Sequence, residues 1–349
     1  MVIYLVLIGL LILFPSKLQL HGINDTYLSK ESCNTVKGVF ILLIFASHFA
    51  NSYGRGYTNI FDTTYWEFRM ALGQGVVAHF LFYSGYGVML STAKKGKNYI
   101  KEFPRKRILK TLLVYDCSQL IFLIFQLWAG NHYDIKQFVL SFLAWSSFGN
   151  DNWYVFVIIG LYSISWLVLK NERTDKVGAF KITVGTLAFT LFLICAKPGA
   201  TYWYNTTLCY ALGAWYFVYQ SDIEKVLKKD IFYFLCVGAI TALYLLAHKF
   251  WYKNLAVYML TMLLFTLVIV FATMKFQIKN RFLAYCGNHL QGLFLLHRLP
   301  MRFLERYSFF TDNLYVFFAS SVVMTFILEF GFNRLVICME GAGKGDKNE

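Results

Sequence analysis

Charged residues and prolines are scarce in this chain. Of its 349 residues 15% are charged and four are proline, and the mean hydropathy is +0.50. A soluble domain needs a largely polar surface, so this composition excludes an ordinary soluble protein. The chain must therefore be surrounded by lipid over much of its length.

Short segments of alternating polarity are also missing, which excludes an outer-membrane barrel. Internal repeats, low-complexity tracts and a separate soluble domain are absent as well. The few prolines and the 19% of aromatic residues are instead typical of long uninterrupted helices with Trp and Tyr at the membrane surfaces. The sequence predicts an all-α fold.

Cysteines at metal-ligand spacing are lacking too. The seven cysteines are odd in number, and most of them lie within apolar runs, as Cys117, Cys195, Cys209 and Cys236 do. A cysteine among apolar residues behaves as a small, inert apolar side chain. We therefore expect no metal site and no bound cofactor.

Ten apolar segments are long enough to span a bilayer, since a spanning helix needs about 17 to 25 residues. They lie near residues 36–53, 71–92, 109–129, 153–169, 180–196, 202–219, 231–248, 254–274, 282–299 and 314–338. An eleventh, at 1–15, has no basic segment before it and no small-residue cleavage site after it, so we expect a retained helix. The prediction is a polytopic membrane bundle of ten core transmembrane helices with an extra N-terminal helix. We divide it into that helix (1–17), a membrane domain (36–338) and a short cytoplasmic tail (339–349).

The net charge of +14 reports on topology, and we expect contact with membrane lipid but not with nucleic acid. Placing Lys94 to Lys110 in the cytoplasm and alternating sides puts 22 of the 33 Lys and Arg residues in cytoplasmic segments and nine outside. This asymmetry obeys the positive-inside rule, with the N-terminus outside and the C-terminus inside. Residues 135–148 are apolar but short, so we expect an interfacial or re-entrant helix there.

Lys37 and His48 are separated by ten almost wholly apolar residues. Eleven residues turn a helix through about 1100°, three turns and about 20°, and advance it about 16 Å. Both side chains therefore lie on one helix face, with Lys37 near the cytoplasmic end and His48 well inside the bilayer. An ionisable group at that depth is costly and indicates a functional site. The alternative is a histidine that is hydrogen-bonded to a neighbouring helix for structural reasons.

The next span ends in Phe82-Tyr83-Ser84-Gly85-Tyr86 and leads directly into a cluster of basic residues. Arg107 and Lys110 lie one helical turn apart in that cluster. Cations gathered beside a membrane pocket are suited to the phosphates of a nucleotide-bearing donor. The alternative is a basic loop that only sets topology and contacts lipid.

A third stretch, Gly287 to Pro300, contains His289 and His297 within an apolar span. Eight residues leave the two histidines about 80° apart on a helix, so they need not share a site.

Together these stretches resemble the bacterial membrane acyltransferase-3 family, whose members O-acylate surface glycans with acyl-CoA. Lys37-Gly38 through His48-Phe49 is similar to the family's Arg-x10-His element. Phe82 to Tyr86 matches its Phe-x-Ser-Gly-aromatic element, and Arg107 to Lys110 matches its Arg-x-x-Arg element. Further likeness at Asn152-Trp153-Tyr154 and at Gly287 to His297 with Pro300 extends the resemblance over most of residues 36–338.

Two departures from the family pattern concern the donor site. Lys37 and Lys110 replace arginines, and a lysine lacks the two-pronged geometry that arginine offers to phosphate. A third departure is the presence of Leu290, Gln291 and Phe294 where the family has serine and tyrosine, which weakens any catalytic role for that helix.

The resemblance implies transfer of an acyl group, most simply acetyl from acetyl-CoA, to a hydroxyl of an envelope polysaccharide or its lipid-linked precursor at the plasma membrane. His48 would be the general base, and Lys37 would stabilise a phosphate or an oxyanion. The remaining expected site residues bind acyl-CoA (Arg105, Lys106, Arg107, Lys110) or line the pocket (Tyr83, Ser84, Trp153, His297). Direct transfer and an acyl-His48 intermediate both remain open.

Two rival functions are compatible with the residues. A transporter or glycan exporter could use His48, His79, Asp116, His297 and Glu329 as a proton or substrate path. A catalytically inert sensor of the same fold could explain the lysine replacements.

Overall fold

The computed structural model describes residues 2–14, 16–53, 60–170 and 174–345, and this part of the chain is almost wholly helical. Six of its helical stretches are long and apolar enough to cross a membrane by length and composition. The prediction of an all-α, multi-pass membrane bundle is confirmed. The count of ten spans and the three-part division of the chain stay predictions.

The first half of the chain forms helices that begin in the N-terminal segment and end with the predicted fourth core span. They are α1 (Val2–Leu13), α2 (Lys30–Tyr53), α3 (Ile60–Leu72), α4 (Gly75–Phe103), the π-helix η1 (Pro104–Leu109), α5 (Lys110–Trp128), α6 (Ile135–Phe142) and α7 (Trp153–Leu169).

The second half continues in the same way to the C-terminal helix. Its helices are α8 (Lys176–Ala196), η2 (Thr201–Trp203), α9 (Leu208–Leu227), α10 (Asp230–Phe250), η3 (Trp251–Lys253), α11 (Leu255–Lys275), α12 (Arg281–Asn288), α13 (Leu290–Leu296), α14 (Arg298–Leu304), α15 (Ser308–Asp312) and α16 (Leu314–Gly345). Two short strands, β1 (Lys17–Leu18) and β2 (Phe276–Gln277), pair antiparallel.

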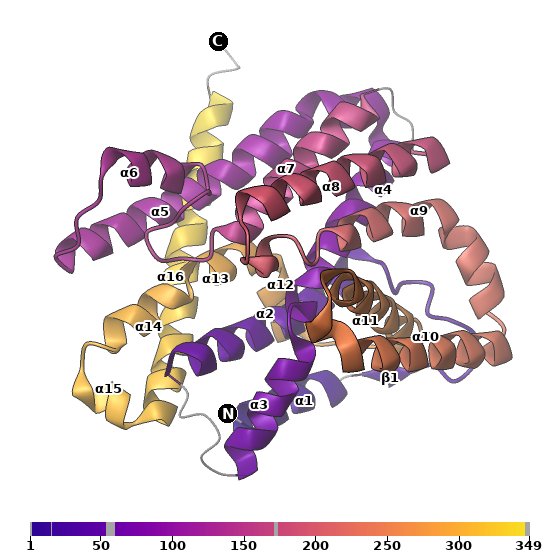
Figure 1. The fold of residues 1–349 in the computed structure, drawn as a ribbon, viewed down its shortest axis with the longest axis horizontal. Helices are drawn as coiled ribbons and strands as arrows, with labels where there is room; N and C mark the ends of the chain where they lie inside the picture. The colour runs from indigo at the N-terminus through magenta and orange to yellow at the C-terminus, as the bar shows by residue number, and fades with distance from the viewer. Residues whose placement is uncertain (1, 15, 54–59, 171–173, 346–349) are drawn as a thin grey trace.

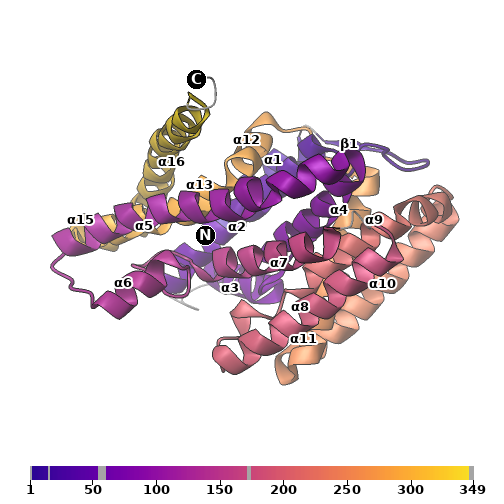
Figure 2. The ribbon, with the colours of Figure 1, turned by 90° about the horizontal axis from the view of Figure 1, so that it is seen from above.

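α2 lies in the middle of the bundle, with α14 to α16 on one side of it and α10 and α11 on the other (Figures 1 and 2). Its sequence is apolar around the whole helix between Gly38 and Ala46, and a helix of that kind must be buried on every side. α10 is the opposite case, because Tyr233 is its one buried residue, Cys236, Val237, Ile240 and Tyr244 are only partly buried against the core, and most of its other side chains are exposed.

One segment agrees with the sequence prediction and two differ from it. α6 has eight residues, about 12 Å of helix, so the segment 135–148 does not span, as expected. The basic segment is helical and not a loop, because Lys, Arg and Glu are good helix formers and the chain changes direction at Gly96, with φ of +53°. The predicted span at 282–299 is divided into α12, α13 and α14, with breaks at His289 and His297.

Glycines bring α2 and α12 into backbone contact. A Cβ atom on Gly38 would lie 1.9 Å from the carbonyl oxygen of Leu283, and one on Gly287 would lie 1.8 Å from that of Asn34. Small residues let helices approach closely in membranes, where apolar burial does not drive association. Gly38 and Gly287 therefore let α2, the helix that carries Lys37 and His48, pack directly against α12.

Gly38→Ala should force α2 and α12 apart and lower the free energy of unfolding by about 1 to 3 kcal/mol or more, since backbone cannot move aside cheaply. Gly87→Ala is the matched control, because a Cβ there meets nothing within 4 Å. Thermal unfolding of both variants in detergent measures the difference. Equal melting temperatures would contradict this account of Gly38.

Segments predicted to share the cytoplasmic side do contact one another. The Asp230 carboxylate accepts hydrogen bonds from Gly22 N and Lys275 Nζ, and it lies 3.1 Å from His21 Nδ1. The β1–β2 pair likewise joins the segment that follows α1 to the segment that follows α11.

Candidate functional site

His48 lies in a cluster of four ionisable side chains drawn from three parts of the chain. Its Nδ1 is 2.6 Å from Nε2 of His297 and 3.1 Å from Oδ2 of Asp151. Arg298 Nε lies 2.7 Å from the same carboxylate oxygen. Asp151 comes from the α6–α7 connection, and His297 and Arg298 come from the break between α13 and α14.

The hydrogen bonds of this cluster fix the tautomers of the neutral imidazoles. A carbonyl oxygen can only accept, so His297 Nδ1, 2.8 Å from the Phe294 carbonyl oxygen, carries a hydrogen. Nε2 of His297 is then an acceptor, and His48 Nδ1 must be the donor to it. Nε2 of His48 is left with its lone pair free to accept a proton.

Asp151 supplies the negative charge of the cluster. Burial alone would raise the pKa of its carboxyl, but the hydrogen bond from His48 and the positive charge of Arg298 hold that pKa well below its usual range. The carboxylate therefore stays ionised at neutral pH. It can stabilise a positive charge that forms on His48 when the ring takes up a proton.

A cavity of about 630 Å³ opens beside His48. Segments on its wall include the end of α2, the α3–α4 junction, the α6–α7 connection, η3 and α14. All of these belong to the side that the charge pattern assigns to the outside. The volume lies within the range of ordinary ligand pockets.

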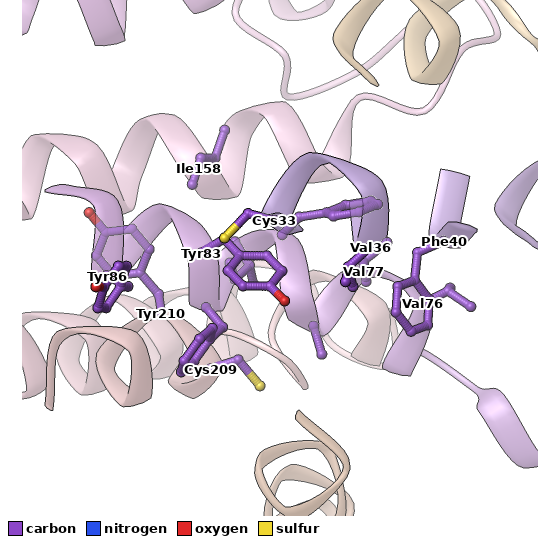
Figure 3. Packing of buried hydrophobic residues seen from close by; sticks show 14 of the residues in the cluster. Cys33, Val36, Phe40, Val76, Val77, Tyr83, Tyr86, Ile158, Cys209 and Tyr210 are labelled. Carbon is purple, nitrogen blue, oxygen red and sulfur yellow. The ribbon is translucent and has the colours of Figure 1, made fainter. Parts of the chain in front are cut away.

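Lys37 lies at the other end of α2, beside Tyr83 of α4. Its ammonium group is 5.6 Å from the centre of the Tyr83 ring, and the Tyr83 hydroxyl is buried without a hydrogen-bond partner. Figure 3 shows Tyr83 next to Cys33 of α2. The structure thus brings the Lys37 element of α2 and the Phe82 to Tyr86 element of α4 together.

Arg107 is the residue of the predicted donor site that approaches Lys37. Within the described part of the chain neither of these two cations makes an ion pair. All four predicted acyl-CoA residues are exposed, and Lys106 pairs with Glu102 at 2.7 Å. Their assignment to acyl-CoA binding stays a prediction.

The predicted pocket residues are divided between the two ends. Trp153 lines the cavity beside His48, and His297 lies behind the His48 ring and is 1% exposed. Tyr83 belongs with Lys37, and Ser84 lies near Tyr154 inside the bundle.

Asp151 and Arg298 are the residues that the sequence interpretation missed. Asp151 directly precedes the Asn152-Trp153-Tyr154 landmark, and Arg298 directly follows His297. The carboxylate directly before that landmark was the signal that could have identified Asp151.

The cluster also contains a set of atoms suited to a metal ion. Ligand atoms of His48, Asp151 and His297 all lie within 4.8 Å of one another, and two imidazoles with one carboxylate are a familiar zinc or iron set. The same atoms satisfy one another by hydrogen bonding, however, and the adjacent Arg298 guanidinium opposes a further cation. The expectation of no metal stays a prediction.

Of the ionisable residues of the transporter alternative, His48 and His297 are in contact. His79 stacks on Phe40, and Glu329 accepts a hydrogen bond from His289 at 2.6 Å, so these two residues have other partners than His48. His289 and His297 do not share a site, as their helical spacing predicts.

Comparison with known families gives one finding. Residues 31–334 match a family model described as an acyltransferase domain. The match includes α2 and every residue of the His48 cluster. Neither the curated proteins nor the solved structures contain a match to this chain.

Proposed function

The chain belongs to the acyltransferase-3 family, and from this premise we propose that it moves an acetyl group from acetyl-CoA to a hydroxyl of an envelope glycan at the plasma membrane. Membership of this family supports the general activity, which is acyl transfer to a polysaccharide-type acceptor by a multi-pass membrane protein. The identity of the donor, the membrane and the residue roles are the proposal.

The unbonded Nε2 of His48 is the observation on which the proposal rests. His48 lines the cavity, and its Nδ1 is committed to His297 and Asp151. Nε2 is therefore the atom that can act as the general base. In the reaction Nε2 takes the proton of the acceptor hydroxyl as its oxygen attacks the thioester carbon. The C–S bond breaks, and the departing sulfur takes the proton from His48 to leave as the CoA thiol.

Asp151 stabilises the imidazolium that forms during this step. Its carboxylate lies 3.1 Å from His48 Nδ1, and Arg298 fixes it from the other side at 2.7 Å. An ion pair that is already oriented needs no rearrangement when charge develops.

Lys37 and Arg107 hold the phosphates of the donor at the cytoplasmic end. Lys37 and Arg107 carry like charges, and neither has a carboxylate partner in the described part of the chain. An anion placed between them therefore stabilises both. The orphaned Tyr83 hydroxyl beside Lys37 offers a further hydrogen bond to the donor.

Direct transfer and transfer through an acyl-His48 intermediate make different demands on the donor. The helical rise between Lys37 and His48 is about 16 Å, so direct transfer requires the thioester to extend that far from bound phosphates. In the second route Nε2 of His48 attacks the thioester carbon, the C–S bond breaks and CoA leaves as the thiolate. The acceptor oxygen then attacks the acyl carbon, the bond to Nε2 breaks, and the hydroxyl proton is released to solvent, where the thiolate takes up a proton.

Thiol release tests the activity itself. The purified full-length protein is incubated with acetyl-CoA, with and without an acceptor oligosaccharide, and free CoA thiol is measured. We expect acceptor-dependent release together with acetylated oligosaccharide. Labelled acetyl groups that stay on the protein without acceptor would favour the histidine intermediate, whereas acetyl-CoA left intact with all acceptors would contradict the donor assignment.

Arg107→Gln should raise the KM for acetyl-CoA, provided that donor binding equilibrates before chemistry. A lost hydrogen bond to a charged group costs about 1.5 to 3 kcal/mol, which corresponds to about 10- to 100-fold in KM.

The control is the double variant Lys94→Gln, Lys95→Gln, because both lysines are exposed and, unlike Arg107, neither is among the charged groups near Lys37. Removing their charge tests the alternative that the basic segment acts only through total charge near lipid. Equal KM values in both variants would favour that alternative.

A further inference from the structure

The cavity beside His48 carries more positive than negative charge. Arg69, Arg298 and Arg302 line it, and Asp151 is the one acidic residue on its described wall. Asp151 is already paired with Arg298. The wall therefore has an excess of cationic groups, although a neutral sugar would need only hydrogen-bonding and apolar ones.

Arg302 is the least satisfied of these cations. Within the described residues it makes neither an ion pair nor a hydrogen bond, although it is partly buried. The nearest acidic side chain along the chain, Glu305, accepts a hydrogen bond from Tyr53 and does not line the cavity. A guanidinium group that loses water without gaining a partner is stabilised by an incoming anion.

The backbone at Gly149 lets this guanidinium reach the cavity wall. Gly149 has a φ of +123°, and a Cβ there would lie 2.4 Å from Nη1 of Arg302. The same connection carries Asp151 two residues later. Arg302 is thus held beside the segment that orients His48.

Aromatic rings make up much of the rest of the wall. Trp153 is buried within it, Trp251 and Tyr258 stack with ring centres 4.8 Å apart, and Tyr252 is 74% exposed at the edge. Aromatic rings present a flat apolar face against which the C–H groups of a sugar ring can pack. A saccharide and an anion are therefore both accommodated.

We propose that the acceptor is an anionic glycan, with a carboxylate or phosphate group bound by Arg302 while the hydroxyl to be acylated lies at Nε2 of His48. This inference rests on the proposed function and narrows its substrate class. Arg302 and His48 line the same cavity. The negative charge of the acceptor therefore lies on the acylated sugar or on its neighbour.

Binding of defined trisaccharides, measured by calorimetry on the purified full-length protein without acyl-CoA, tests the proposal. The probes are trigalacturonic acid, its methyl ester and maltotriose carrying a phosphate. We expect at least one of the two anions to bind about 10- to 100-fold more tightly than the neutral ester, the factor for a hydrogen bond to a charged group. The preferred anion identifies carboxylate or phosphate as the natural group. Equal binding of acid, ester and phosphate would overturn the proposal, and this comparison needs no variant.

Arg302→Gln should remove the preference for the anion and leave binding of the ester unchanged. Arg306→Gln is the matched control, since Arg306 stacks on Phe125 and Trp128 and does not line the cavity. If the Arg302 and Arg306 variants lost the preference for the anion equally, the proposal would also be overturned.

The outcomes separate this inference from the proposed function. Tight anion binding without thiol release from acetyl-CoA would support the anion site and contradict the donor assignment. Equal acylation of the neutral ester and the anions would support the function and contradict the anion site.

Discussion

His48→Ala is expected to lower the rate of acyl transfer by about 10²- to 10⁴-fold, the usual contribution of a general base. The protein should remain inserted and folded, because His48 is at the cavity wall and its removal leaves space that water can enter. The fall should appear in kcat, while the KM for acetyl-CoA, which depends on the opposite end of α2, stays near its original value. Steady-state thiol release measures both quantities.

His132→Ala provides the control for loss of a histidine, because His132 is exposed in the α5–α6 connection. It should behave as the unmodified protein does. Glycan acylation by the His48 variant at a rate close to normal would remove His48 from the catalytic site.

Asp151→Asn is expected to lower kcat by about 10²- to 10³-fold, the scale on which loss of one preorganised electrostatic group in a buried site acts. The amide keeps the shape of the side chain but gives up the charge that balances His48 and Arg298. Since the carboxylate is ionised at neutral pH, the loss should be present throughout the neutral range.

Asp134→Asn is the matched substitution on the same side of the bundle. Asp134 caps α6 by accepting a hydrogen bond from Gln137 N, and asparagine caps helices equally well. Its kcat should be unchanged. A similar loss in both variants would mean that Asp151 acts on stability and not on the reaction.

Most of the fold was predictable because lipid imposes a strong rule on sequence. Every backbone polar group inside the bilayer must be bonded within its own segment, so long apolar runs become helices. Most of the predicted segments from 36–53 to 314–338 accordingly coincide with helices, although 71–92 crosses the α3–α4 junction and 202–219 begins before α9. The breaks at His289 and His297 were not predicted, because apolar composition is the same on a continuous helix and on three short ones.

The candidate site was only partly predictable for a different reason. Lys37 and His48 belong to one helix, so their relation follows from helical geometry alone. The contact of His48 with Asp151 and His297 joins residues 103 and 249 positions apart, and it depends on how separate helices pack. The cations of the basic segment could be recognised by type, but only the packed structure separates Arg107 from Lys106.

The burial of α2 on every side has a consequence for the choice of donor. A rod enclosed by other helices and in backbone contact with α12 cannot lengthen, shorten or tilt freely. The distance between Lys37 and His48 along α2 is therefore fixed. If the donor phosphates stay near Lys37, the arm between phosphate and thioester, which is the same in every acyl-CoA, must cover this distance. The acyl group lies beyond the thioester carbon, so its length would be limited by the space past His48, where a long acyl chain would compete with the sugar.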